Sequence, residues 1–105
     1  MIKVTYYIGT CDKDTCKREL LYCQFVECFN ELFLNYTCQN AEGVYTMKDT
    51  GTIVKEFTFI VTTFINNCTE KTLNEHIQYN CTTLKDKSNQ ESVLVEVTKP
   101  EVMFV

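Results

Sequence analysis

Seven cysteines in a chain of 105 residues restrict most strongly what this protein can be. Disulfides persist in oxidising compartments and are rare where glutathione keeps thiols reduced. Six of the seven cysteines can pair, and the sequence alone does not choose among the possible pairings. We therefore expect a disulfide-stapled domain in which the odd thiol is either buried or paired with a second chain, giving a dimer. The disulfide candidates are Cys11, Cys16, Cys23, Cys28, Cys38, Cys68 and Cys81.

Three Asn-x-Thr sequons point to the same compartment, and they predict glycosylation at Asn35, Asn67 and Asn80. Threonine is abundant here, so one or two sequons would arise by chance. Together with the cysteines they predict a secreted protein or one on the extracellular face of a membrane. Because the first four residues lead directly into strand-like sequence, we interpret Met1 as the start of a mature domain whose signal peptide is missing.

The composition fits one globular domain over residues 1–105. With 45% hydrophobic and 12% aromatic residues, the chain can build a packed core. A net charge of −4 repels phosphate backbones and anionic lipid, and no apolar run is long enough to span a bilayer. We expect no nucleic-acid partner and no membrane insertion.

The first half of the chain reads as a strand followed by a helix. Residues 2–9 alternate between apolar and polar side chains, which predicts a half-buried strand. Asp14 or Thr15 can cap a helix that covers residues 17–36. The last turn of that helix could instead be a strand. The apolar stripe of the helix consists of Leu21, Phe25, Cys28, Phe29, Leu32 and Tyr36.

The second half reads as strands. Residues 44–48, the turn at 49–51 and residues 52–65 predict a hairpin. Residues 77–82 alternate and predict another strand, with Asn80 facing water and Cys81 facing inward. A polar loop at 85–91 then leads to a last strand around residues 93–97.

No catalytic or metal-binding arrangement stands out. The pairs Cys11/Cys16 and Cys23/Cys28 have spacings that zinc tolerates, but the second pair lies on different faces of the predicted helix and the chain has no second histidine. His76 would need a neighbouring cysteine or serine and an orienting acid to act in nucleophilic catalysis, and a solvated side chain is the simpler interpretation. We predict no enzyme, no metal and no cofactor, and we keep a thiol enzyme that uses His76 as a third alternative.

Two cysteines flank the segment between two predicted strands. A bridge from Cys68 to Cys81 would close a loop of a size that stabilises the folded state by about 3 kcal/mol. This is the pairing that the spacing favours.

The order of strand, long helix and antiparallel strands resembles the cystatin superfamily, in which one helix lies across a wrapped sheet. The resemblance continues in Glu56-Phe57-Thr58-Phe59, in a strand that runs on to Cys68, and in Cys81 at the next strand. Inhibitory cystatins carry a Gln-x-Val-x-Gly loop where this chain has Lys48-Asp49-Thr50-Gly51, and a Pro-Trp loop where this chain has no tryptophan. No inhibitory site residue carries over.

A second resemblance is to an immunoglobulin-like domain. Residues 75–81 resemble its strand F, because Tyr79 stands two residues before Cys81. Residues 93–97 would be strand G, and Cys38 would be the partner cysteine. The core tryptophan is missing, and the helical stretch before Cys38 has no place in such a sandwich.

The sequence thus predicts an α+β fold with one amphipathic helix on an antiparallel sheet of four or five strands, stapled by disulfides. An immunoglobulin-like β-sandwich is the alternative. The predicted function is a secreted, glycosylated module that binds another extracellular protein as an inhibitor, decoy or immune modulator. The competing hypothesis is a receptor or adhesion ectodomain.

Overall fold

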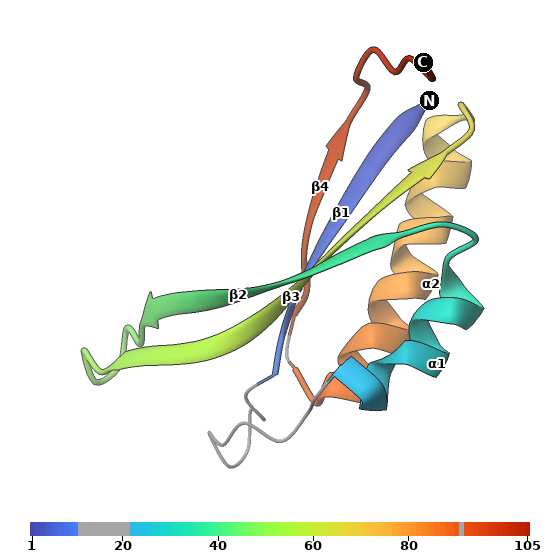
Figure 1. The fold of residues 1–105 in the computed structure, drawn as a ribbon. Coiled ribbons are helices and arrows are strands. Elements are labelled where there is room, and N and C mark those ends of the chain that lie inside the picture. The colour runs from blue at the N-terminus through green and yellow to red at the C-terminus, as the bar shows by residue number, and fades with distance from the viewer. Residues whose placement is uncertain (11–21, 91) are drawn as a thin grey trace.

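The computed structural model describes residues 1–10, 22–90 and 92–105, and the side chain of Tyr22 is not described. Helices and strands follow one another as β-α-β-β-α-β, and the strands form an antiparallel sheet of order β2-β3-β1-β4 (Figure 1). This is the arrangement of the ferredoxin-like fold. The elements are β1 Ile2–Gly9, α1 Tyr22–Leu32, β2 Thr37–Thr46, β3 Ile53–Ile65, α2 Glu70–Ser88 and β4 Leu94–Thr98.

Strand β1 lies in the middle of the sheet and supplies much of the core. It pairs with β3 on one side and with β4 on the other. Because successive side chains of a strand point to opposite faces, its even-numbered residues all meet the helices. These are Ile2, Val4, Tyr6 and Ile8, each at most 1% exposed.

Helix α1 packs an aromatic face on the same side of the sheet. Phe25 and Phe29 are fully buried, and their ring centroids lie 5.4 Å apart. The ring of Phe59 on β3 meets Phe25 edge-on at 5.2 Å. Such edge-to-face contacts stabilise aromatic clusters beyond the burial of their area.

Helix α2 is defined by signals at both ends. The Thr69 side chain accepts a hydrogen bond from the Thr72 amide at 3.2 Å, which satisfies a free first-turn donor. Asn89 ends the helix in the left-handed conformation with φ of 49°. The residues of α2 that are buried follow a helical spacing, and they are Leu73, Asn80, Leu84 and Ser88.

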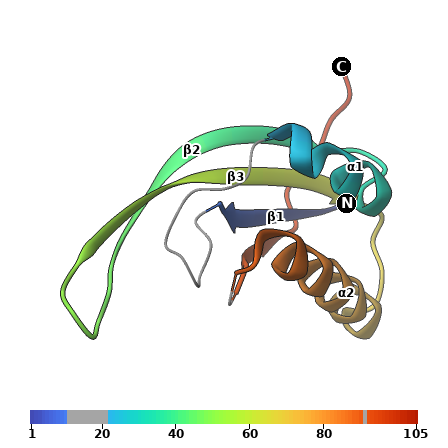
Figure 2. The same ribbon diagram turned by 90° about the horizontal axis from the view of Figure 1, so that it is seen from below.

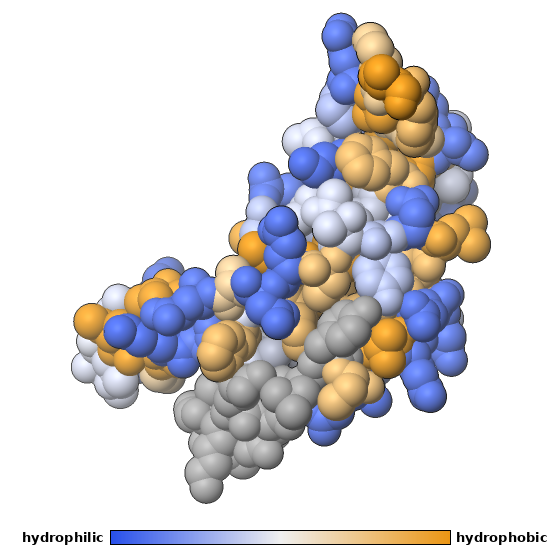
Figure 3. Space-filling view, in the orientation of Figure 1, coloured by the Kyte–Doolittle hydropathy of each residue, from blue (hydrophilic) through white to orange (hydrophobic). Residues whose placement is uncertain are grey.

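The β2–β3 hairpin extends well beyond the rest of the sheet. Strand β1 pairs with β3 only from Thr58 to Ile65, and the Phe57 carbonyl accepts a last hydrogen bond from the Thr10 amide, so residues 53–56 pair with β2 alone. We call residues 42–57 the arm. Figures 1 and 2 show the arm projecting away from both helices, and in Figure 3 hydrophobic and hydrophilic residues lie side by side along it. The exposed apolar side chains of the arm include Val44, Tyr45, Ile53 and Phe57.

Several sequence predictions are confirmed by this architecture. The α+β class, the four-stranded antiparallel sheet, the strand at residues 2–9 and the hairpin with its turn are all present. Gly51 occupies the turn with φ of 70°, a conformation that side chains other than glycine rarely adopt. The predicted helix is shorter than expected, since α1 ends at Leu32, and its expected caps Asp14 and Thr15 lie outside the described residues.

Other predictions about the fold are wrong. Residues 77–82 are helical rather than a strand, and most of the expected loop at 85–91 also belongs to α2. The chain therefore packs two helices on the sheet. The cystatin resemblance predicts a single helix, and the immunoglobulin alternative predicts no helix at all. None of the described helices is both long and apolar enough to cross a membrane.

Candidate functional site

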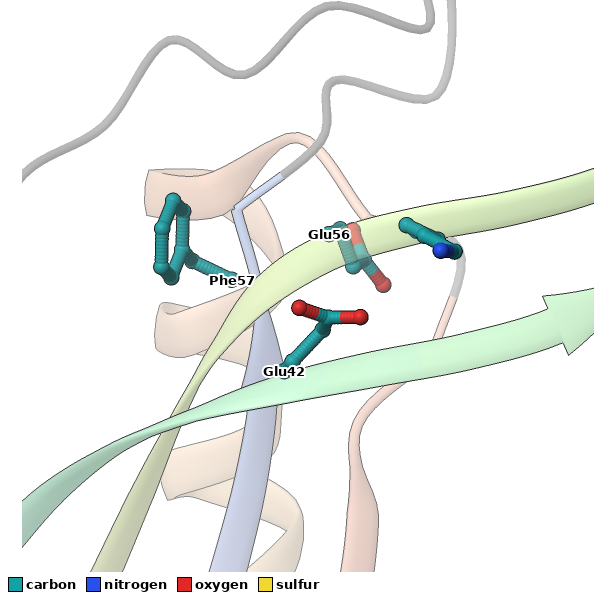
Figure 4. A pocket seen from close by; sticks show the side chains of 4 residues that line it. Glu42, Glu56 and Phe57 are labelled. Atoms are coloured by element: carbon teal, nitrogen blue, oxygen red, sulfur yellow. The ribbon is translucent and has the colours of Figure 1, made fainter.

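A pocket of about 180 Å³ lies at the base of the arm. Its lining residues come from the two strands of the hairpin, with Glu42 on β2 and Lys55, Glu56 and Phe57 on β3. In the sheet register Glu42 is opposite Phe57, and Gly43 is opposite Glu56. Figure 4 shows the two carboxylates on neighbouring strands, with the ring of Phe57 to one side.

The position of Glu56 depends on a glycine in β1. The nearest carboxylate oxygen of Glu56 lies only 2.6 Å from the place where a Cβ atom on Gly9 would be. A side chain at position 9 would therefore displace the carboxylate. Gly43 shows the same crowding with Thr58, also at 2.6 Å. The absence of a side chain at these two strand positions leaves room for the groups on β3.

The pocket combines acidic, basic and aromatic groups. Two carboxylates and one ammonium give it a net negative charge, which favours a cation. Phe57 is half exposed and can add a cation–π contact to a ligand that carries positive charge. Lys55 can pair with a carboxylate on the same ligand. The arrangement suits a small molecule that bears charges of both signs with an excess of positive charge near the carboxylates.

The residues around the pocket do not form a metal-binding site among the described residues. Among the described residues, no three histidine, cysteine or acidic side chains come together as metal ligands. Cys11 and Cys16, one of the two pairs with zinc-like spacing, lie outside the described residues.

The described cysteines are free thiols. Their positions explain why the expected Cys68–Cys81 bridge is wrong: Cys68 precedes α2, whereas Cys81 lies in its twelfth position. A helix rises about 1.5 Å per residue, so Glu70 and Cys81 alone are separated by roughly 16 Å. A disulfide requires Cα atoms within about 7 Å. The free cysteines are Cys23, Cys28, Cys38, Cys68 and Cys81.

Three of these thiols pack against the core. Burial raises the pKa of Cys28, Cys38 and Cys81, and the carboxylate of Glu31 raises the pKa of Cys28 further. Since the thiolate is the reactive form, a raised pKa makes a cysteine a poor nucleophile. These cysteines therefore act as small apolar core residues.

The three sequons lie in very different environments. Asn80 is 1% exposed, so a glycan on the folded protein has no room there and the predicted site is wrong. The Asn35 amide is engaged in two hydrogen bonds with the backbone of Phe64, at 3.0 and 3.2 Å. Asn67 is exposed just before α2. Glycosylation at Asn35 and Asn67 stays a prediction.

Asn80 instead connects α2 to β1. Its amide nitrogen donates to the Tyr6 hydroxyl at 3.0 Å and lies 3.3 Å from Nε2 of His76. Burial raises the pKa of Tyr6 to about 12. His76 is thus the exposed end of a buried polar contact, and the neighbour that the structure gives it is an amide rather than a thiol.

No pattern in the sequence marks the pocket residues as a site. Glu56 and Phe57 stand out only as part of a strand, and Glu42 and Lys55 not at all. One signal was present, since Gly43 is a glycine inside a strand, and such a glycine marks a close approach of another group.

Comparison with known proteins identifies the fold. No protein-family model and no curated protein matches the sequence. The structure is similar to a phage SAM lyase in complex with S-methyl-5′-thioadenosine, with a TM-score of 0.77 and 19% identity over 93% of this chain and 80% of that chain. It is also similar to a phage SAM lyase in the apo state, with a TM-score of 0.73 and 19% identity over 92% of this chain and 78% of that chain.

These findings correct the functional predictions. The two solved structures just compared are those of a phage enzyme, and not of a cystatin or an immunoglobulin domain. The predicted secreted and non-catalytic binding module is therefore wrong, as are the roles of inhibitor, immune modulator or adhesion ectodomain. The extracellular location fails for the same reason, and the free thiols remove the observation on which it was based.

Proposed function

We propose that this protein is an enzyme that cleaves S-adenosylmethionine and releases S-methyl-5′-thioadenosine. The observation that carries the proposal is the likeness of fold over 93% of the chain to a phage SAM lyase that holds this thioether. The identity of 19% does not by itself transfer the activity. The proposal therefore also depends on the chemistry of the arm pocket.

The pocket suits the charges of this substrate. S-adenosylmethionine carries a sulfonium cation, an α-ammonium group and a carboxylate. Glu42 and Phe57 leave the same face of the hairpin and match the sulfonium. Glu56 comes from the other face and matches the α-ammonium, and Lys55 matches the carboxylate. The volume of about 180 Å³ holds only part of such a molecule. We assign it to the methionine end, where both charged groups and the bond to be broken lie close together.

The reaction balances without a further reactant. The bond between sulfur and the γ-carbon of the methionine portion breaks, and its electron pair passes to sulfur, which leaves as a neutral thioether. The four-carbon portion then either loses a proton to a base or closes a ring through its own carboxylate. Glu56, fixed above Gly9, is the carboxylate that we place beside the reacting atoms. There it accepts the proton or holds the α-ammonium while the ring closes.

The test is incubation of the purified protein with S-adenosylmethionine, followed by chromatography and NMR. We expect S-methyl-5′-thioadenosine to accumulate, and NMR of the four-carbon product distinguishes vinyl protons from a lactone ring. Glu56→Gln keeps the size of the side chain and should lower the rate about 100-fold or more, the usual contribution of a positioned acid–base group. Glu75→Gln makes the same change on the exposed surface of α2 and should leave the rate unchanged.

Two results would count against the proposal. One is that the wild-type protein, folded by circular dichroism, leaves the substrate intact. The other is that Glu56→Gln and Glu75→Gln have equal rates, which would remove Glu56 and the arm pocket from the reaction.

A further inference from the structure

The described residues that line the arm pocket can recognise an amino acid at three separate points. Glu42 is opposite Phe57 in the sheet register, so a carboxylate and an aromatic ring share one face of the hairpin (Figure 4). Glu56 comes from the opposite face, where its carboxylate lies beside Gly9. Lys55 supplies a cation. A ligand that matches all of these groups carries an α-ammonium, a carboxylate and a second positive group.

The size of the pocket suits such an amino acid better than a complete nucleoside derivative. Its volume of about 180 Å³ is well below the roughly 300 Å³ at which pockets begin to enclose a drug-sized ligand. S-adenosylmethionine must therefore leave its adenosyl portion outside. The methionine end alone engages every charged group of the described lining, so that lining has no further charge to offer the nucleoside.

The positive sulfur is recognised by its charge and not by the groups attached to it. A sulfonium has no N–H or O–H to donate, so the Glu42 carboxylate attracts it only as an opposite charge. The ring of Phe57, which is half exposed, attracts a cation in the same way. Neither attraction depends on which carbon groups the sulfur carries. A neutral thioether such as methionine receives neither of them.

The reaction also uses only the part of the substrate that fits the pocket. When sulfur carries two methyl groups, the bond from sulfur to the γ-carbon breaks, its electron pair passes to sulfur, and dimethyl sulfide leaves as a neutral thioether. The four-carbon portion then loses a proton to Glu56 or closes a ring through its own carboxylate. Atoms and charges balance without a further reactant, as they do for S-adenosylmethionine.

We propose that the arm pocket accepts sulfonium α-amino acids as a class, and that the protein also releases dimethyl sulfide from S-methylmethionine. This inference rests on the proposed function and names the substrate class of the same site. Lys55 and Glu56 bind the amino-acid end, and Glu42 and Phe57 bind the positive sulfur. The adenosyl group contributes binding energy from outside the pocket, so its loss lowers the rate without ending the reaction.

The experiment is incubation of the purified protein with S-methylmethionine and, in parallel, with S-adenosylmethionine. Gas chromatography of the headspace measures dimethyl sulfide against a sample without protein. We expect dimethyl sulfide to form with a kcat/KM about 10–100-fold below that for S-adenosylmethionine, which is the usual contribution of contacts to one base. S-methylmethionine should also inhibit the cleavage of S-adenosylmethionine competitively, and methionine should inhibit it at least tenfold more weakly, because its sulfur is neutral.

Variants connect this second reaction to the pocket. Glu56→Gln should lower the release of dimethyl sulfide about 100-fold or more, whereas Glu75→Gln on the exposed surface of α2 should leave it unchanged. Lys55→Met keeps an unbranched side chain without its charge and should raise the KM for S-methylmethionine at least tenfold. Circular dichroism reports whether each variant is folded.

The outcomes separate this inference from the proposed function. Cleavage of S-adenosylmethionine without any dimethyl sulfide from S-methylmethionine would overturn the inference and leave the proposed function intact. If the folded wild-type protein cleaves neither compound, both are overturned together. Equal release of dimethyl sulfide by the wild type and by Glu56→Gln would overturn the assignment of the reaction to the arm pocket.

Discussion

The buried contact between Asn80 and Tyr6 gives a quantitative prediction about stability. Asn80→Ala leaves the Tyr6 hydroxyl, in a residue that is fully buried, without its donor at 3.0 Å. An unsatisfied buried polar group costs about 1–3 kcal/mol, and the small cavity left by the amide adds roughly 1 kcal/mol. We therefore expect Asn80→Ala to lower the free energy of unfolding by about 3 kcal/mol, a large part of the 5–15 kcal/mol typical of a domain.

The two residues should also be coupled. Tyr6→Phe alone leaves the Asn80 amide with His76 as a neighbour, so we expect a loss of about 1–2 kcal/mol. In the Tyr6→Phe background no hydroxyl is left to be orphaned, so Asn80→Ala should cost about 1–2 kcal/mol less than in the wild type. Urea unfolding at pH 7, with equal slopes for all variants, measures each corner of this cycle.

The control and the refuting result are defined by the same cycle. Tyr7→Phe removes a hydroxyl from the next residue of β1, whose bond to Glu96 is exposed, and should leave the urea midpoint almost unchanged. If the effects of Tyr6→Phe and Asn80→Ala add within about 0.3–0.5 kcal/mol, the hydrogen bond does not couple the helix to the sheet.

Two further predictions follow from pKa values. Because the pKa of Tyr6 is raised from 10.0 to about 12, the stability that its neutral form contributes is fully present below pH 10 and is lost as the pH rises through about 12. Urea unfolding should show a loss approaching about 2.7 kcal/mol that Tyr6→Phe abolishes, and an equal loss in that variant would contradict it. Alkylation at pH 8, followed by mass spectrometry, should modify the two exposed cysteines of the described residues first. The three cysteines packed against the core should react later, because burial raises their pKa. A reversed order would refute this assignment. The exposed pair is Cys23 and Cys68, and the slower set is Cys28, Cys38 and Cys81.

The strand at residues 2–9 and the hairpin could be predicted because their side chains face different media. Ile2, Val4 and Tyr6 meet the helices, while Lys3 and Thr5 lie on the other face, so the period of two is visible in the sequence. The hairpin was found because Gly51 marks a turn between two long runs of strand-forming residues.

Helix α2 could not be found by the same criterion. Its inward stripe includes Asn80 and Ser88 beside Leu73 and Leu84, so the apolar period of the helix is interrupted by polar side chains. Asn80 is satisfied by Tyr6, and the Ser88 hydroxyl donates to the Leu84 carbonyl at 2.7 Å. Both bonds are tertiary or local details that composition does not reveal. The short alternation around Ile77 then dominated the prediction.

The end signals of α2 were nevertheless in the sequence. Thr69 is the third residue of a sequon, but a threonine before a run of polar residues with helix propensity is also an N-cap. Asn89 stood in an expected loop, although asparagine is one of the residues that end helices in the left-handed conformation. A cap at each end defines a helix even when its buried face is partly polar.

The largest error had its origin in the cysteines. Many cysteines in a short chain predict cross-linking, because disulfides are the common reason for such an abundance. The structure gives another physical reason: Cys28, Cys38 and Cys81 fill small spaces between α1, α2 and the sheet, where a thiol packs like a short apolar side chain. Once the thiols are core residues, the sequons lose their support as well, and Asn80 becomes a buried contact rather than a glycan site. What then distinguishes this chain from a purely structural α+β domain is the set of charged groups at the base of the arm, where Gly9 and Gly43 make room for the side chains of β3. A side chain at position 9 would displace the Glu56 carboxylate, so the glycine in β1 keeps this charged group at the base of the arm.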